Sequence, residues 1–462
     1  MERLGSLDAM FIAVEDATNH MHIGSVGIFE GPTPGYDAVL AVVRSKIPLV
    51  PRYHQRVREA PLSVGRPLWI DDPALDLDYH VRHTALPPDE PDALDHLVAR
   101  VMSQPLDRHR PLWEMWMVEG LPDGGWALVS KVHHCMVDGI AGTDLLATML
   151  DLAPDAPLAT PRPWTWSGPP SRLALAWETA AGAVGAVRDV AVGIAGALVH
   201  PHRAATRLGG VVAGIAELLG AGDRPAETLT GPIGPQRRWT RTEASLADVA
   251  TIRHACGGTV NDVVLAAGTR GYRALLDHRD ALAGAGTVST LVPVSLRAAD
   301  ARGVLDNRVA ALRALLPVGI DDPVETLAAV RAHLDDLKGS HEVAASATVD
   351  TLGTVLPPLL AAASARLAVH SQEWFQTVTT NVPGPQFPLY LAGRRMTAGY
   401  PFVPIAGHLR LGVAIWSYCG TLYLGVTGDR DGATDLDVLA DGIARGFADL
   451  LDAATTHATV DA

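Results

Sequence analysis

The stretch Trp126–Leu150, WALVSKVHHCMVDGIAGTDLLATML, organises the interpretation of the whole chain. Its first residues, Trp126 to Val132, are rich in β-branched and apolar types, which is typical of a buried strand. From Gly139 onward, apolar residues recur at helical spacing. The sequence therefore predicts a strand, a short loop and a helix, with two histidines and an aspartate gathered where the strand meets the loop.

The two histidines are His133 and His134. Successive side chains of a strand point to opposite faces, so the two rings are not expected to share one cavity. A neutral imidazole can accept a proton from a hydroxyl near pH 7, which makes one of them a candidate general base while the other packs or hydrogen-bonds. A purely structural pair is one alternative. A metal site is another, although no further Cys or His cluster at ligand spacing accompanies the pair.

The motif HHCMVDG resembles the HHxxxDG motif of the CoA-dependent acyltransferase superfamily. Its surroundings resemble the bacterial wax ester synthase/diacylglycerol acyltransferase family in particular. The blocks that carry this resemblance, in the family's order, are MERLGSLDAMF (1–11), GRPLWIDDPALDLDYHVRH (65–83), PLDRHRPLWEMWMVEGL (105–121), TVNDVVLA (259–266), LVPVSLR (291–297), DNRV (306–309) and TNVPGP (380–385). Only residues 155–230 and the final residues lie outside the resemblance.

The resemblance implies an α/β fold of two chloramphenicol-acetyltransferase-like domains. Each would be a mixed sheet with flanking helices, and an active-site tunnel would lie at their interface. It also implies no bound cofactor, because the acyl group arrives already activated as a long-chain acyl-CoA. CoA and the acceptor would enter from opposite sides and meet at His134.

The resemblance further assigns roles within the motif. His134 is expected to act as the general base, and His133 to orient its neighbour or help position substrate. Asp138 and Gly139 are expected to hold the loop. In related acyltransferases an arginine from elsewhere in the fold holds this aspartate, and Arg297 is the candidate here.

Arg308 is the second candidate for that pairing. Further donors could stabilise a developing oxyanion. Asn261 lies in a predicted helix that begins after Thr259, and the family requires its block for activity. Thr380 and Asn381 precede a Pro-Gly turn, where a hydroxyl or amide could serve the same purpose. Turn architecture is the alternative explanation for these two residues.

The composition narrows the class of protein. The chain has 462 residues, of which 48% are hydrophobic and 19% charged, so it can bury more than one core. The formal net charge of -14 argues against nucleic-acid binding. Three widely spaced cysteines fit a reducing compartment, and the N-terminal residues do not form a signal peptide. We therefore expect a cytoplasmic protein.

We expect an N-terminal domain over residues 1–155, a C-terminal domain over 236–455 and a disordered tail over 456–462. The intervening segment, 156–235, is rich in alanine and proline and is expected to be a crossover linker. Within it, residues 179–199 form an apolar run split by Arg188 and Asp189, too short to span a membrane. That run could be an interfacial helix at a membrane or lipid droplet, or could pack on its own protein.

The absence of a Gly-x-Ser-x-Gly elbow and of a Walker loop in the sequence argues against a serine acyl-enzyme and against ATP-driven activation. The resemblance implies direct transfer from acyl-CoA, and the likeness of its blocks to actinobacterial triacylglycerol synthases makes diacylglycerol the expected acceptor, forming triacylglycerol. Wax ester synthesis from a long-chain alcohol is the first alternative. A non-catalytic lipid-droplet or membrane-associated binding protein is the second.

Overall fold

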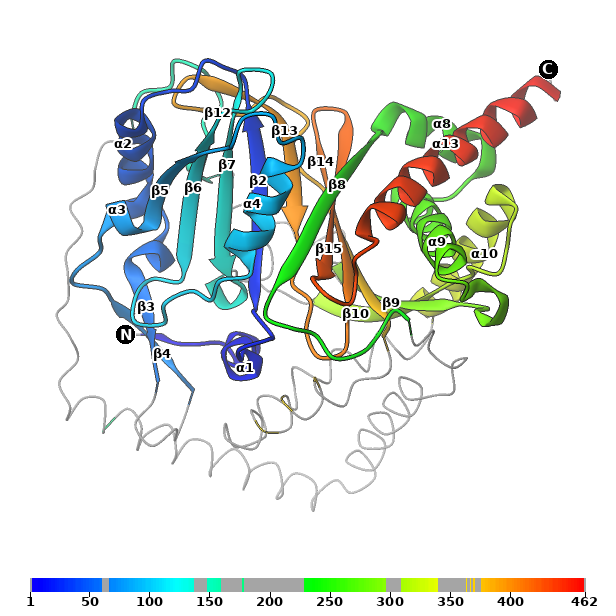
Figure 1. The fold of residues 1–462 in the computed structure, drawn as a ribbon, viewed down its shortest axis with the longest axis horizontal. Coiled ribbons are helices and arrows are strands. Elements are labelled where there is room, and N and C mark those ends of the chain that lie inside the picture. Colours follow the sequence, from blue (N-terminus) through cyan, green and yellow to red (C-terminus); the bar gives the residue numbers. More distant parts are fainter. Residues whose placement is uncertain are drawn as a thin grey trace.

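A computed structural model of the chain describes residues 2–59, 66–136, 148–158, 228–295, 309–339 and 375–460, together with residues 177, 363, 366 and 369. Two six-stranded sheets stand side by side, with helices packed around them (Figure 1). A smaller three-stranded sheet has the order β1-β4-β3. The predicted α/β architecture with two sheets is confirmed.

The first sheet has the strand order β12-β13-β2-β7-β6-β5. Its strands are β2 (His22–Phe29), β5 (Val81–Ala85), β6 (Trp113–Glu119), β7 (Trp126–His133), β12 (Tyr390–Leu391) and β13 (Arg394–Phe402). The helices of this first unit are α1 (Ser6–Val14), α2 (Tyr36–Lys46), α3 (Leu77–His80) and α4 (Ala93–Met102). The small sheet consists of β1 (Glu2–Arg3), β3 (Gln55–Arg58) and β4 (Leu68–Asp71).

Strand β7 confirms the buried strand predicted at the start of the organising stretch. All eight of its residues are buried, and it pairs antiparallel with β2 on one side and β6 on the other. His22 of β2 lies opposite His133, the last residue of β7. The chain then turns through a short 3-10 helix, η4 (His134–Met136). The helix predicted after Gly139 lies almost wholly outside the described residues.

The second sheet has the order β10-β9-β11-β14-β15-β8. Its strands are β8 (Arg237–Ser245), β9 (Val288–Ser295), β10 (Val309–Leu316), β11 (Thr377–Val382), β14 (Leu411–Tyr418) and β15 (Thr421–Asp429). The helices of this second unit are α8 (Leu246–Cys256), α9 (Val260–His278), α10 (Pro323–Gly339) and α13 (Leu436–Val460). These helices cover one face of the sheet (Figure 1), and together they form the second hydrophobic core.

The other face of the second sheet is turned toward the first unit. Trp239, Trp416 and Tyr423 come from strands of the second sheet, yet their side chains belong to the core of the first unit. Because the strand side chains alternate, the same strands send aliphatic residues into the second core. The second sheet is therefore buried on both faces, which explains the long apolar runs in its strands.

The sheets do not follow the division of the chain at residues 155 and 236. Strand β13 lies in the predicted C-terminal domain, but it pairs antiparallel with β2 in the first sheet, from Met396 opposite Phe29 to Phe402 opposite Gly24. The expected division into 1–155 and 236–455 needs correction on this point. Hydrogen-bonding groups along the edge of β2 are satisfied by a strand from the far end of the chain.

The chain ends differ from the prediction too. Helix α13 continues to Val460, so much of the segment 456–462, expected to be a disordered tail, is helical. Most of the predicted linker, 156–235, lies outside the described residues. Strand β8 begins at Arg237, next to the predicted domain start at 236.

Helix α9 begins as the sequence predicts. Thr259 is its N-cap, and its hydroxyl accepts a hydrogen bond from the Asp262 N–H while the Asp262 carboxylate accepts one from the Thr259 N–H at 2.6 Å. This reciprocal capping box satisfies donors that the first turn would otherwise leave free. Asp262 is therefore explained by the start of the helix.

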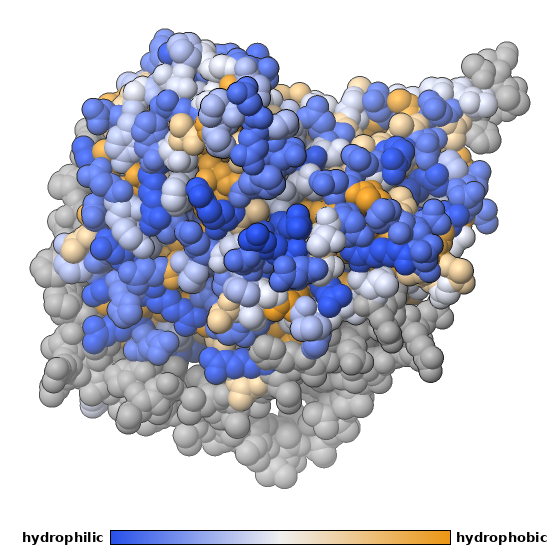
Figure 2. Space-filling view, in the orientation of Figure 1, coloured by the Kyte–Doolittle hydropathy of each residue, from blue (hydrophilic) through white to orange (hydrophobic). Residues whose placement is uncertain are grey.

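The visible surface is mostly polar, with apolar side chains in small separate patches (Figure 2). Among the described residues, no helix is both long enough and apolar enough to cross a bilayer. The run at 179–199, considered above for membrane contact, lies outside the described residues.

Candidate active site

His134 lies in the turn that follows β7. Its ring stacks on Phe11 of helix α1, with ring centroids 4.0 Å apart and planes at 26°. Its backbone N–H donates a hydrogen bond of 2.8 Å to the carbonyl of Met21, just before β2. Helix α1, the start of β2 and the end of β7 therefore all contact this one residue.

The His134 imidazole is neutral at pH 7. Burial lowers its pKa to about 4, because the interior stabilises the uncharged ring, and the nearby His133 lowers it further while its own backbone carbonyl raises it. The Nδ1 atom is shielded from solvent. A neutral histidine is in the protonation state that a general base requires.

His133 has different surroundings, as the strand alternation predicts. Its side chain is fully buried, and its Nδ1 accepts a hydrogen bond of 3.1 Å from the N–H of Cys135. Its Nε2 lies 3.5 Å from Oε1 of Glu15. Because Nδ1 accepts, a ring proton belongs on Nε2, which lies toward the carboxylate. The two rings of the motif thus face different partners.

Glu15 joins several of these groups. Its Oε1 lies 3.2 Å from Nε2 of His22, and it accepts a hydrogen bond of 3.3 Å from the N–H of Met21. Its Oε2 accepts two hydrogen bonds from the guanidinium of Arg108, at 2.8 and 3.2 Å. Burial alone would raise the pKa of Glu15, but contacts with His133 and His22 hold it well below its usual range. The carboxylate is therefore charged at all working pH values.

Sequence reasoning did not identify Glu15 or Arg108. It also gave no chemical role to Phe11 and His22, which contact the motif directly. The block at residues 1–11, which resembles the family, was the feature of the sequence that could have pointed to this N-terminal region. A pairing between residues 93 positions apart, however, leaves no trace in local periodicity.

Several predicted residues fall outside the described part of the chain. These are Asp138, Gly139, Arg297 and Arg308. Strand β9 ends at Ser295, two residues before Arg297. The pairing of Asp138 with an arginine therefore stays a prediction.

The candidate oxyanion donors are described, but no hydrogen bond joins them to His134 within the described residues. Asn261 lies in the first turn of α9. On β11, Thr377 bonds to Tyr272 of α9, so residues 377, 379 and 381 face the helices by strand alternation. Thr380 then lies on the opposite face, which packs toward the first unit, while Asn381 lies on the helix side. Of the three residues, Thr380 is on the side of the sheet that faces the first unit.

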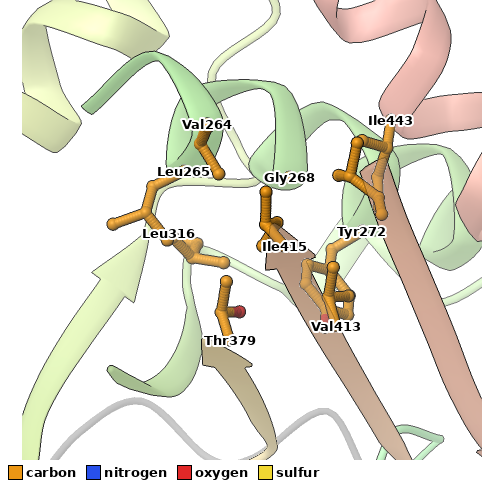
Figure 3. Close-up of a pocket in the computed structure, with 10 residues that line it drawn as sticks. Val264, Leu265, Gly268, Tyr272, Leu316, Thr379, Val413, Ile415 and Ile443 are labelled. Carbon is orange, nitrogen blue, oxygen red and sulfur yellow. The ribbon is translucent and has the colours of Figure 1, made fainter. Parts of the chain in front are cut away.

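A small cavity lies on the helix side of the second sheet (Figure 3). Its walls are aliphatic residues of α9 and of strands β10, β14 and β15, with Thr379 and Tyr272 as polar members. Thr379 is bonded to Thr290 at 2.8 Å. The space is no larger than a water molecule needs, and it lies across the sheet from the histidines, so it is a packing void and not the reaction site.

The described residues contain no group of three or more His, Cys, Asp and Glu side chains arranged to hold a metal ion. His22, His133 and Glu15 do converge, but the ring nitrogens are within 3.5 Å of the same carboxylate oxygen. That arrangement fits hydrogen bonding between them.

Comparison with known proteins identifies the family. The model of the wax ester synthase/diacylglycerol acyltransferase catalytic domain matches residues 4–264, and that of the C-terminal domain of the same family matches residues 305–451. The chain belongs to this family. The resemblance found in the sequence is thereby confirmed, and both histidines lie within the catalytic-domain match.

A relative within the family is a Mycobacterium tuberculosis protein named "Probable diacylglycerol O-acyltransferase tgs1". It is 37% identical over 463 residues, which cover 98% of this chain and 96% of the relative. Another M. tuberculosis protein, named "Putative diacylglycerol O-acyltransferase Rv3371", is 32% identical over 98% of this chain and 91% of its own length.

Solved structures confirm the fold. The wax ester synthase/diacylglycerol acyltransferase from Marinobacter aquaeolei VT8 superposes with a TM-score of 0.71 at 24% identity, covering 98% of this chain and 100% of that one. The starter condensation domain of rhizomide synthetase, in complex with C8-CoA, superposes with a TM-score of 0.56 at 14% identity, covering 98% and 95%. The chain thus has the two-sheet acyltransferase fold that the family resemblance implied.

Proposed function

We propose that this protein transfers the acyl group of a long-chain acyl-CoA to the free hydroxyl of diacylglycerol, producing triacylglycerol and CoA. Membership of the family and the 37% identity to a relative named for this reaction support the substrates. The observation that carries the chemistry is His134, a neutral imidazole held under Phe11 at the end of β7.

In the proposed mechanism the His134 ring carries its proton on the buried Nδ1, and the lone pair of Nε2 remains for the substrate. Nε2 takes the proton of the acceptor hydroxyl as its oxygen attacks the thioester carbonyl. The tetrahedral intermediate then collapses with cleavage of the carbon–sulfur bond, and His134 returns the proton to the CoA thiolate.

Charge on the tetrahedral oxygen requires a donor. Thr380 is the best placed of the three candidates, because its strand face is turned toward the first unit, where His134 lies. Asn261 and Asn381 are then expected to support the fold around α9 and β11. The proposed reaction needs no cofactor beyond the acyl-CoA substrate.

The acceptor is a water-insoluble lipid, so the proposal includes transient contact with a membrane or lipid-droplet surface. Sedimentation with diacylglycerol-containing vesicles tests this part. We expect the protein to pellet with such vesicles. Recovery of all protein in the supernatant would remove membrane contact from the proposal.

The central experiment supplies purified protein with palmitoyl-CoA and, in separate reactions, dioleoylglycerol, hexadecanol or no acceptor. Free CoA is followed with a thiol reagent, and the ester is identified by chromatography. We expect CoA release that depends on dioleoylglycerol and falls about 100-fold or more in His134→Ala, the range for loss of a general base. Circular dichroism of the variant checks that the fold survives.

Other outcomes contradict the proposal in distinct ways. A preference for hexadecanol would make the protein a wax ester synthase that uses the same histidine. Release that persists in His134→Ala would assign the base to another residue. No release with any acceptor would favour the non-catalytic alternative.

A further inference from the structure

We propose that Glu15 and Arg108 are positioning residues that hold His134 in its reactive place. The inference rests on the proposed function, because it concerns the residue that we assign as the base. Neither side chain touches the His134 ring. Each contact that fixes His134 nevertheless leads back to this carboxylate–guanidinium pair through one further group.

The first connection runs through Met21. Its carbonyl accepts the His134 N–H at 2.8 Å, and its own N–H donates to Oε1 of Glu15 at 3.3 Å. The peptide groups of Met21 therefore lie between the catalytic backbone and the carboxylate. Movement of Glu15 would move the acceptor that holds His134.

The second connection runs through His133. Its Nδ1 accepts the N–H of Cys135, the residue directly after His134, and its Nε2 faces Oε1 of Glu15. The carboxylate keeps the proton on Nε2, which leaves Nδ1 free to accept. Without that charge, the ring could take the other tautomer, and the contact with Cys135 would be lost.

The third connection runs through helix α1. One terminal nitrogen of Arg108 donates to Oε2 of Glu15 at 2.8 Å and to the carbonyl of Ile12 at 3.0 Å. Ile12 follows Phe11, whose ring stacks on His134. Arg108 therefore links the Glu15 carboxylate by hydrogen bonds to the part of α1 whose Phe11 covers the His134 ring.

Replacement by glutamine tests why a carboxylate is needed. Three N–H groups donate to the two oxygens of Glu15, one from Met21 to Oε1 and two from Arg108 to Oε2, and the Nε2 atoms of His22 and His133 lie 3.2 and 3.5 Å from Oε1. An amide has only one accepting oxygen, so its NH2 group must face donors on one side. We expect the network to open on that side while the side-chain volume stays the same.

The experiment compares Glu15→Gln, Glu15→Asp and a matched control, Asp435→Asn. Asp435 also pairs in a bidentate manner with a largely buried arginine, Arg279, at 2.5 and 2.7 Å, but in the second unit. The control therefore removes a similar ion pair without touching the site. For each protein we would measure kcat, the KM for palmitoyl-CoA and the thermal midpoint.

We expect Glu15→Gln to lower kcat by about 10- to 100-fold, with KM within about threefold, since a small misplacement of a reacting group has effects of this size. Glu15→Asp keeps the charge and should recover part of the loss. Asp435→Asn should lower the thermal midpoint but leave kcat close to wild type. A kcat for Glu15→Gln within about twofold of wild type, or an equal loss in Asp435→Asn, would overturn the proposal.

A second readout does not depend on the acyltransferase reaction. Diethyl pyrocarbonate modifies neutral imidazoles, and peptide mapping by mass spectrometry gives the rate at His134 alone. We expect this rate to change by about threefold or more in Glu15→Gln and to stay unchanged in Asp435→Asn. An unchanged rate in both would refute positioning, even if no acceptor supported transfer and the proposed function itself had failed.

Discussion

The low pKa of His134 predicts an unusual dependence of activity on pH. An exposed histidine has a pKa of about 6.5, so its general-base activity declines below neutral pH. Burial beneath Phe11 lowers the pKa of His134 to about 4. Because kcat/KM follows ionisation of the free enzyme, its acid limb should lie near that value. Activity should then persist well into mildly acidic solution.

Phe11→Ala is the perturbation that tests this cause. At pH 5.5 a base with a pKa of about 4 is more than about nine-tenths neutral, whereas one with a pKa of about 6.5 is about one-tenth neutral. Removing the Phe11 ring admits water to the imidazole and should shift its pKa toward 6.5. The ratio of kcat/KM at pH 5.5 to that at pH 7.5 should therefore fall by several-fold, up to about tenfold.

The assay measures kcat/KM from pH 4.5 to 8 by chromatography of the ester product. Leu7→Ala is the control, since Leu7 lies on the same helix with 48% of its surface exposed. Returning each sample to pH 7.5 and repeating the measurement excludes unfolding. This check matters because His134 and His22 have lowered pKa values, so the unfolded chain binds more protons and stability falls as pH drops below about 6.5. A wild-type acid limb near pH 6.5 would refute the reasoning.

Three further predictions concern stability. A Cβ on Gly271 would lie 2.5 Å from a side-chain carbon of α13, so Gly271→Ala should lower the unfolding free energy, measured by thermal melts, by about 1–3 kcal/mol. A Cβ on Gly268 would meet nothing within 4 Å, so Gly268→Ala should be neutral or stabilising in the same measurement. Thr259→Ala removes the N-cap of α9 and should cost about 0.5–2 kcal/mol in denaturant titrations; an unchanged midpoint would contradict the capping role. Burial raises the pKa of Asp95 to about 6 although Arg241 lies 3.2 Å away, so the stability contributed by this carboxyl alone, opposite in sign to that of the two histidines, should decline as pH rises from about 4 to 6, and the thermal midpoint of wild type relative to Asp95→Asn should fall over that range.

Local features of the fold could be predicted from the sequence. The strand at residues 126–133 is recognisable because most of its eight buried residues are apolar and show no helical period. The start of α9 is recognisable because capping depends on residue types three positions apart. Both signals are contained within one element.

Features that depend on distant partners could not be predicted. The alternating pattern of Arg394–Phe402 predicts a strand but does not reveal that its partner is β2 of the first sheet. Glu15 and Arg108 are ordinary charged residues until the fold brings them together around His133. The different surroundings of His133 and His134 follow partly from the alternation of side chains along a strand. They also depend on the 3-10 turn that follows β7, which the strand pattern does not predict.

The pairing of β13 with β2 has a consequence for biosynthesis. A ribosome releases the N-terminal residues long before it reaches Phe402, so β2 must wait with one edge unpaired. An unpaired edge strand readily joins another chain, and contacts between distant residues form slowly. Nascent chains of this protein should therefore depend on chaperones until translation is nearly finished. Fragments that stop before β13 should aggregate when expressed alone and regain solubility when the missing strand is supplied in trans.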